Sequence, residues 1–107
     1  MATASVELGK VSYNRELHGA CVRQESLTIS GTEAELATAV TAAEAAAGVE
    51  MARVATDTAC YVAVGSAPDT TATTATNATT ARRLIPAGWI FDTPIGIGEK
   101  VAVKAIA

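Results

Sequence analysis

The stretch of residues 84–103, LIPAGWIFDTPIGIGEKVAV, constrains the fold most, because it combines alternating apolar residues with closely spaced Pro and Gly. It holds the single Trp and the single Phe of the chain, two of its three Pro and three of its eight Gly. Pro cannot donate to a β-ladder and Gly favours bends, so these residues bound short strands and do not lie within them. We therefore predict two short strands joined by a link rich in turns, with a strand over residues 59–65 packed beside them.

The first of these two strands carries the large aromatic residues. Side chains alternate between two faces of a strand, which places Trp89 and Phe91 on one face and Ile90 and Asp92 on the other. We expect the Trp89 ring to be buried, because the chain has few other large residues to anchor a core. Truncation of a buried ring of this size costs about 3–5 kcal/mol, which is a large part of the stability of a small domain.

Further segments show the alternation that is typical of a strand with one buried side. We predict strands over residues 20–30, 49–55, 59–65 and 100–105. The residues expected to share the apolar face of each strand are Leu27 and Ile29, Ala52 and Val54, Cys60, Val62 and Val64, and Val101, Val103 and Ala105. In the last strand Lys100, Ala102 and Lys104 are expected to face solvent. The pattern predicts a mainly β fold, either a small antiparallel β-sandwich or a jelly-roll-like barrel.

Two segments fit more than one structure. Residues 1–19 are polar and mixed, and they fit either an N-terminal arm that lies over a neighbour or a first strand that pairs at an edge, with residues 20–107 as a single β domain. Residues 33–47 are rich in Ala and fit a short helix, capped by Thr32 with Glu35 three residues on, and ended by Gly48. A strand over residues 35–41 followed by a loose loop fits this segment equally well.

Residues 66–81, SAPDTTATTATNATTA, lack any large apolar side chain, so they cannot bury enough surface to offset the entropy of ordering. We predict a long exposed Thr- and Ala-rich loop between two strands. Such loops within a small domain are often functional or disordered. Arg82 and Arg83 follow the loop directly, and they fit either a solvated pair at its rim or a contact with an acidic partner surface.

The composition argues against several classes of partner. The net charge is −3 and the chain has no basic stripe, which argues against nucleic-acid binding. No apolar run approaches the ~20 residues that span a bilayer, and the N-terminus has no signal-peptide pattern, so we expect a cytoplasmic start. Cys21 and Cys60 lack metal-site or redox spacing, and we expect two buried free thiols.

The sequence shows no catalytic constellation. The single His, His18, has no Cys, Asp or second His at ligand spacing, which argues against a metal site. The carboxylates of Asp57, Asp69, Asp92 and Glu99 fall in predicted turns, where such groups usually accept local hydrogen bonds. No candidate nucleophile has a base beside it. We therefore predict a protein that is not an enzyme and uses neither a metal nor another cofactor.

Residues 52–68, ARVATDTACYVAVGSAP, and 83–106, RLIPAGWIFDTPIGIGEKVAVKAI, resemble a group of small virion proteins of tailed bacteriophages and prophages. In that group a strand with the pattern (V/I)A(I/V)G-x-x-P precedes a Thr/Ser/Ala-rich loop, an LPAG motif, an aromatic strand and G-(D/E)-K-(V/I)-A-V. The matching pieces are residues 62–65 with Pro68, residues 84–88 and residues 98–103, and SLTISGT at residues 26–32 also fits. The chain departs from the pattern at Ile85, within LPAG, and in the Ala-rich residues 33–48, which resemble an insertion.

The resemblance implies a β-sandwich or jelly-roll-like domain on the outside of a phage head or at a neck or tail site. We therefore expect a virion structural protein, assembled in the host cytoplasm, that acts as a capsid decoration (cement) or head-associated protein. Its partners would be the major capsid protein or other virion proteins, and we expect a homo-oligomer. A neck or tail component and a carbohydrate-binding β module are the alternatives. The expected partner-contact residues are Arg82, Arg83, Thr73, Thr76, Asn77 and Tyr13.

Overall fold

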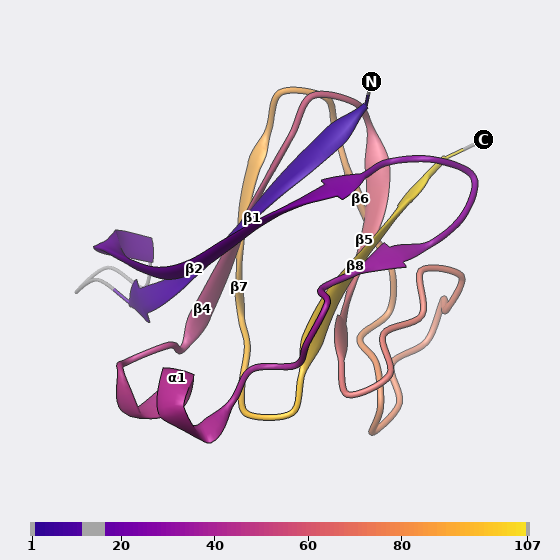
Figure 1. The fold of residues 1–107 in the computed structure, drawn as a ribbon. Helices are drawn as coiled ribbons and strands as arrows, with labels where there is room; N and C mark the ends of the chain where they lie inside the picture. The colour runs from indigo at the N-terminus through magenta and orange to yellow at the C-terminus, as the bar shows by residue number, and fades with distance from the viewer. Residues whose placement is uncertain (1, 12–16, 107) are drawn as a thin grey trace.

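The computed structural model, which describes residues 2–11 and 17–106, contains eight strands in two four-stranded antiparallel sheets packed face to face (Figure 1). Sheet A has the order β2 (Leu17–Thr28), β1 (Thr3–Val11), β4 (Met51–Thr56) and β7 (Ile90–Pro94). Sheet B has the order β3 (Ala34–Glu35), β8 (Lys100–Ala105), β5 (Cys60–Gly65) and β6 (Arg83–Ile85). The predicted mainly β sandwich is confirmed.

The strand order is jelly-roll-like, with a long antiparallel ribbon rolled up so that successive arms fall in different sheets. Three nested pairs form this ribbon, namely β5 with β6, β4 with β7 and β3 with β8. β1 completes sheet A by pairing with β2 on one side and with β4 on the other. From β2 onward, the chain therefore crosses between the sheets at every connection except the one from β5 to β6.

The N-terminal segment forms β1, which lies between β2 and β4 in sheet A. The sequence fitted either an N-terminal arm or a strand at a sheet edge, and the structure shows an inner strand. Ala4 lies opposite Leu27 of β2 and opposite Thr56 of β4. Every second side chain of the strand, at Ala4, Val6 and Leu8, is buried between the sheets. Because these alternate residues are apolar, this face of β1 packs against sheet B.

The core between the sheets is aliphatic, and none of its fully buried side chains in the described residues is aromatic. The expectation that Trp89 is buried is wrong, because its side chain is 62% exposed. Trp89 precedes β7 in the link that crosses from sheet B to sheet A, directly after a turn at Gly88, whose φ is +79°. The link is held by its backbone, with the Gly88 N–H donating to Thr56 O at 2.8 Å. The ring is thereby left at the end of the sandwich, while Phe91 points inward and is half-buried.

Residues 31–48 combine the two predicted alternatives. A short helix, α1 (Ala42–Ala46), lies within the predicted range, but Thr41 caps it and Glu44 completes the capping box, in place of Thr32 and Glu35. The residues before it are extended and run along β8, where Leu36 N–H donates to Val101 O and Val40 N–H donates to Glu99 O, both at 3.0 Å. Leu36 and Val40, both 2% exposed, enter the core from this extended backbone, which prevents a helix from starting at Thr32.

The loop of residues 66–81 folds back over the outer face of sheet B (Figure 1). At one edge, Glu33 Oε1 accepts hydrogen bonds from the N–H and the hydroxyl of Thr70, at 2.7 and 2.6 Å. At the other edge, Arg82 N–H donates to Ala72 O at 2.7 Å. Ala102, which we expected to face solvent, is 0% exposed between these two anchors. Most loop side chains are exposed, but hydroxyl and backbone hydrogen bonds hold the loop in place where apolar burial is lacking.

Candidate binding site at the β6–β7 edge

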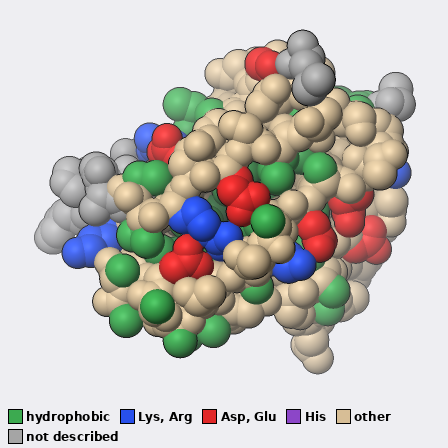
Figure 2. Space-filling model, in the orientation of Figure 1, with side chains coloured by type: hydrophobic (Ala, Val, Ile, Leu, Met, Phe, Trp, Pro, Cys, Tyr) green, Lys and Arg blue, Asp and Glu red, His purple; other side chains and the backbone are tan. Residues whose placement is uncertain are grey.

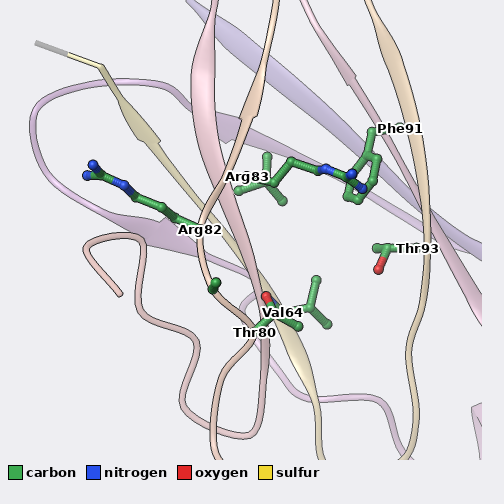
Figure 3. A pocket seen from close by; sticks show the side chains of 8 residues that line it. Val64, Thr80, Arg82, Arg83, Phe91 and Thr93 are labelled. Carbon is green, nitrogen blue, oxygen red and sulfur yellow. The ribbon is translucent and has the colours of Figure 1, made fainter. Parts of the chain in front are cut away.

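A cleft of about 320 Å³ opens between the sheets where the edge strands β6 and β7 face each other (Figure 3). Its lining comes from β5, from the chain that leads into β6, and from β7. The lining residues are Val62, Val64, Thr80, Ala81, Arg82, Arg83, Phe91 and Thr93. This lining contains no carboxylate, imidazole or thiol, so the chemistry that it offers is apolar contact, hydroxyl groups and guanidinium donors.

The cleft exists because the chain leaves sheet B just before β6. Thr80 is bonded to β5 on both sides, since its N–H donates to Val64 O at 2.8 Å and its Oγ1 accepts from the Val64 N–H at 3.0 Å. Regular pairing resumes only at Arg83, which lies opposite Val62. Between these points Arg82 bonds to the loop and not to the sheet. The cleft consequently reaches inward to the β5 side chains of Val62 and Val64, which are themselves only 2% and 5% exposed.

The two arginines beside the cleft point in different directions (Figure 3). The Arg83 guanidinium reaches from sheet B toward sheet A, with its central carbon 5.0 Å from the centroid of the Phe91 ring. The Arg82 side chain points away from the cleft and stacks on Tyr61, at 4.1 Å from that ring's centroid. Neither arginine belongs to any of the four ion pairs found among the described residues. Arg83 therefore bridges the mouth of the cleft, and within residues 2–11 and 17–106 its charge has no carboxylate partner.

The segment of residues 84–90, which we call the crossover segment, connects β6 to β7 and carries three large exposed apolar side chains. Leu84 is 54% exposed, Trp89 62% and Ile90 60%. Trp, Tyr and Arg are enriched at the energetic centres of protein interfaces. The strand registers place Leu84 on the outer face of sheet B and Ile90 on the outer face of sheet A, with Trp89 at the end of the sandwich between them. Single exposed apolar residues need no explanation, but three in seven residues mark this end of the sandwich as a candidate contact region.

The opposite side of the sandwich is closed by polar side chains. Arg23, on the inner face of β2, donates to Thr38 Oγ1 at 2.7 Å and to Glu25 Oε1 at 3.2 Å. Its Nε lies 2.9 Å from Glu44 Oε2 without a hydrogen bond, so this contact is an ion pair only. Glu25 in turn accepts from the Ala37 N–H at 3.1 Å. We call these residues the Arg23 seal, because they fill the gap between β2 and the segment that leads to α1.

The structure brings only part of the predicted contact set to one place. Arg82 and Arg83 flank the cleft, whereas Thr73 is exposed in the outer part of the loop. Thr76 and Asn77 are also exposed and line a smaller hollow of about 130 Å³, which adjoins the cleft. Tyr13 lies outside the described residues.

Sequence reasoning missed the other lining residues, although a signal was present. Phe91 and Thr93 alternate along one short strand, and Val62 and Val64 alternate along another. The sequence predicts the inner face of their strands for Phe91, Val62 and Val64 and makes no prediction for Thr93, and all four side chains face inward. What the sequence could not show is that their two strands end up near the same open edge of the sandwich.

The ionisable groups with clearly shifted pKa values lie away from the cleft. Burial raises the pKa of the Cys60 thiol to about 11, with a smaller contribution from Asp57. Hydrogen bonds from the Thr3 N–H and the Thr58 hydroxyl lower the pKa of the Asp57 carboxyl. Cys21 is exposed, so the expectation of two buried thiols is wrong for that residue, which lies on the edge strand β2.

Within the described ranges, no three His, Cys, Asp or Glu side chains are placed to hold a metal ion. The helices of that same part of the chain include none long and apolar enough to cross a membrane. On the face shown in Figure 2, Lys and Arg side chains lie next to Asp and Glu side chains and form no continuous basic surface. The β6–β7 edge remains the best-formed candidate for a contact with another molecule.

Comparison with known proteins reveals no relative: no protein-family model matches the chain, and neither a curated protein nor a solved structure matches it. The resemblance of residues 52–68 and 83–106 to phage virion proteins therefore stays a prediction. The β6–β7 edge, with its cleft and its exposed apolar side chains, is therefore the basis for a proposed function.

Proposed function

We propose that this protein is a non-catalytic structural protein of a tailed-phage virion, and that it binds the outside of the capsid as a decoration or head-associated protein. The β6–β7 edge is the proposed attachment surface. The observation that carries the proposal is the exposure of Trp89, Leu84 and Ile90 within one short crossover segment. A jelly-roll-like fold agrees with a capsid role, although lectins share this fold, so the fold alone decides nothing.

The exposed apolar side chains can supply the affinity. Full burial of a Leu or Ile side chain stabilises a complex by roughly 1.5–3 kcal/mol. A buried aromatic side chain removes about 150–250 Å² of surface from water. Leu84, Trp89 and Ile90 are each more than half exposed, but Leu84 and Ile90 lie on the outer faces of different sheets, so only a partner that wraps around this end of the sandwich buries all three. Association itself costs several kcal/mol, so one such contact is weak. Many copies on a repeating lattice can nevertheless stabilise the lattice as a whole.

The charges near the edge suggest which part of the partner is contacted. Arg82 and Arg83 lie next to the crossover segment, and neither has a carboxylate partner among the described residues. The protein as a whole is acidic, with a net charge of −3, so these two residues form a local positive site. We propose that it faces an acidic surface of the major capsid protein. Assembly into a homo-oligomer, also part of the proposal, would cover other sheet edges.

Co-sedimentation of the purified protein with undecorated capsids of its own virus tests this proposal. Saturation at many copies per capsid, together with a raised capsid melting temperature, is the expected result. Trp89→Ala should weaken binding by about tenfold or more, as truncation of an interface aromatic typically does. Val22→Ala is the matched control, because Val22 is exposed on β2, at the far edge of sheet A. Binding at only a few copies would favour a neck site, and no binding would refute decoration.

The exposure of Trp89 also favours a second candidate, carbohydrate binding. An exposed indole offers a flat apolar face on which a sugar ring can stack, and Trp89 is the only Trp of the chain. Titration with oligosaccharides while Trp89 fluorescence is recorded tests this function directly. A saturable change that Trp89→Ala removes would support it. An unchanged spectrum across a panel of oligosaccharides would leave protein binding as the role of this edge.

A further inference from the structure

We propose that the cleft binds an extended segment of the partner protein, which adds as a strand to the free edge of β7. One side chain of this segment, a carboxylate, lies against Arg83. A second side chain, apolar and two residues away, lies against Val64. The inference rests on the proposed function only in taking the partner to be a protein, and it names the chemistry by which that partner is recognised.

The position of β7 makes strand addition possible. In the part of the chain that the structure describes, β7 is the last strand of sheet A and pairs with β4 alone. An exposed sheet edge can bind an extended peptide through main-chain hydrogen bonds, while pockets for alternate side chains give specificity. Phe91 and Thr93 are the residues of β7 that face the interior, and both line the cleft. Alternate side chains of an added strand would point the same way and enter the cleft beside them.

The cleft offers two different environments along the direction of the added strand. One end holds the Arg83 guanidinium and the Phe91 ring, and the other holds Val64 and Thr80 (Figure 3). The register of sheet B explains the separation, because Arg83 lies opposite Val62 whereas Thr80 is bonded to Val64, two residues further along β5. Side chains two residues apart on a strand are separated by about 7 Å. A strand with an acidic and an apolar residue two positions apart therefore matches both ends.

Charge complementarity selects the carboxylate. Arg83 has no ion pair in the described part of the chain, and its recorded contact is with the Phe91 ring. A guanidinium has five N–H donors, and paired carboxylate oxygens match its geometry. Thr80 and Thr93 line the cleft near its apolar end, which suits a small or β-branched side chain of the partner. The volume of about 320 Å³ exceeds that of a single side chain of this size.

The two edge strands of sheet A, β2 and β7, differ in how the gap between the sheets is filled beside them, and this difference supports a binding role for the cleft at β7. At β2 the Arg23 guanidinium donates hydrogen bonds to Thr38 and Glu25 and forms an ion pair with Glu44, all within the same chain, although its Nε makes no hydrogen bond. At the β7 edge the corresponding gap is bridged by one arginine that stacks on one ring. A carboxylate supplied by a partner would give Arg83 at the β7 edge the ion pair that Glu25 and Glu44 give Arg23 at the β2 edge.

Selection from a random linear ten-residue peptide library, displayed on yeast and sorted against the folded protein, tests the inference. The enriched peptides should share an acidic residue two positions from an apolar one. Their dissociation constants, measured by fluorescence anisotropy, should rise on the order of tenfold or more for Arg83→Gln, since hydrogen bonds to charged groups are the strong ones. Lys104→Gln is the matched control: it removes one positive charge from the outer face of sheet B and should change the dissociation constant by less than about twofold.

Two further arms separate strand addition from a simple ion pair. N-methylation of alternate amides in the best peptide should abolish binding, because strand addition needs those N–H groups. Arg83→Glu should reverse the preference, so that a peptide with Lys in place of the acidic residue binds best. Failure to enrich any peptide, equal binding to Arg83→Gln, or tolerance of N-methylation would each overturn the inference. Capsid binding is measured separately, so peptide binding without capsid binding would refute the proposed function alone.

Discussion

Replacement of Gly65 by Ala tests how the loop of residues 66–81 is fastened to the sandwich. Gly65 ends β5 and lies directly against the backbone of the loop. A Cβ at this position would overlap the carbonyl oxygen of Ala78 and would lie 2.7 Å from both the carbonyl carbon of Ala78 and the Cα of Thr79. These are backbone atoms, so no change of side-chain rotamer relieves the overlap. The loop has to move away from β5.

The hydrogen bonds that this movement strains set the expected cost. Ala67 N–H donates to Ala78 O at 3.0 Å, and Thr80 N–H donates to Val64 O at 2.8 Å. The Val64 N–H donates to Thr80 Oγ1 at 3.0 Å. At about 0.5–1.5 kcal/mol for each bond, their loss lowers the free energy of unfolding by about 2–4 kcal/mol. Since a domain near this size loses about 4–8 °C of melting temperature per kcal/mol, the midpoint should fall by about 10 °C or more.

Urea denaturation followed by far-ultraviolet circular dichroism measures the change in the free energy of unfolding. Gly31→Ala is the matched control, because a Cβ at Gly31 meets no atom within 4 Å, so the substitution should leave stability unchanged or raise it by at most about 1 kcal/mol. If Gly65→Ala proved as stable as Gly31→Ala, the close contact between loop and strand would be refuted. The wall of the cleft, which includes Thr80 of this loop, would then not be held against β5 as described.

Four further predictions follow from buried, hydrogen-bonded and exposed groups. A thiol reagent at about pH 8 should label Cys21 but not Cys60 in the folded protein, and equal labelling would contradict the burial of Cys60. Folding raises the pKa of the Cys60 thiol from its ordinary 9.0 to about 11. The stabilising contribution of the protonated thiol is therefore complete below about pH 9 and is lost as the pH rises through 11. The free energy of unfolding of Cys60→Ala should consequently fall less steeply than that of the unchanged protein over this pH range. The pKa of Asp57 is lowered, chiefly by the Thr3 N–H, so its contribution is lost as the pH falls below about 4, and Asp57→Asn should flatten that acid limb in urea titrations; an unchanged limb would contradict the hydrogen bond. Trp89→Ala should lower the free energy of unfolding by less than about 1 kcal/mol, whereas a loss of about 3–5 kcal/mol would show that the ring is buried.

Strands whose inner face is set by simple alternation could be placed from the sequence. The predicted ranges 49–55, 59–65 and 100–105 agree within two residues with β4, β5 and β8. In each of these strands the alternate apolar residues do face the core, because burial in a sandwich is decided mainly by which side of the sheet a residue faces. Local sequence carries that information without any knowledge of the partner strands.

Long-range contacts decided the features that the sequence did not reveal. Alternation grouped Trp89 with Phe91, but the strand begins at Ile90, and the turn at Gly88 leaves the indole outside the sandwich. Ala102 faces outward as predicted and is nevertheless buried, because a loop from a distant part of the chain covers it. Thr32 has the sequence of a helix cap, but the pairing of Leu36 with β8 keeps the following residues extended.

The candidate site shows the same division between local and long-range information. Arg82 and Arg83 were singled out because two adjacent arginines follow a polar loop, which is a local pattern. Their opposite directions, one over Tyr61 and one over Phe91, follow from their place at the start of β6. The cleft itself depends on β6 and β7 being edge strands of different sheets, which only the rolled topology determines. Pro94 at the end of β7 fits an edge strand, because Pro cannot donate to a ladder, but no local pattern predicts which strand of the other sheet this edge faces.

The β2 and β7 edges of sheet A differ in how they are blocked, and this difference explains why we expect a partner at β7 and not at β2. Unpaired strand edges favour association, and native proteins usually block them with charged side chains, short strands or covering segments. At β2 the inward-facing Arg23 and Glu25 block the gap, and both are occupied by partners within the chain. At β7 the gap is bridged by Arg83 alone, next to an exposed Trp89. A cation that stacks on an aromatic ring gains only about 0.5–1 kcal/mol at such a site, so a carboxylate that approaches Arg83 meets little competition.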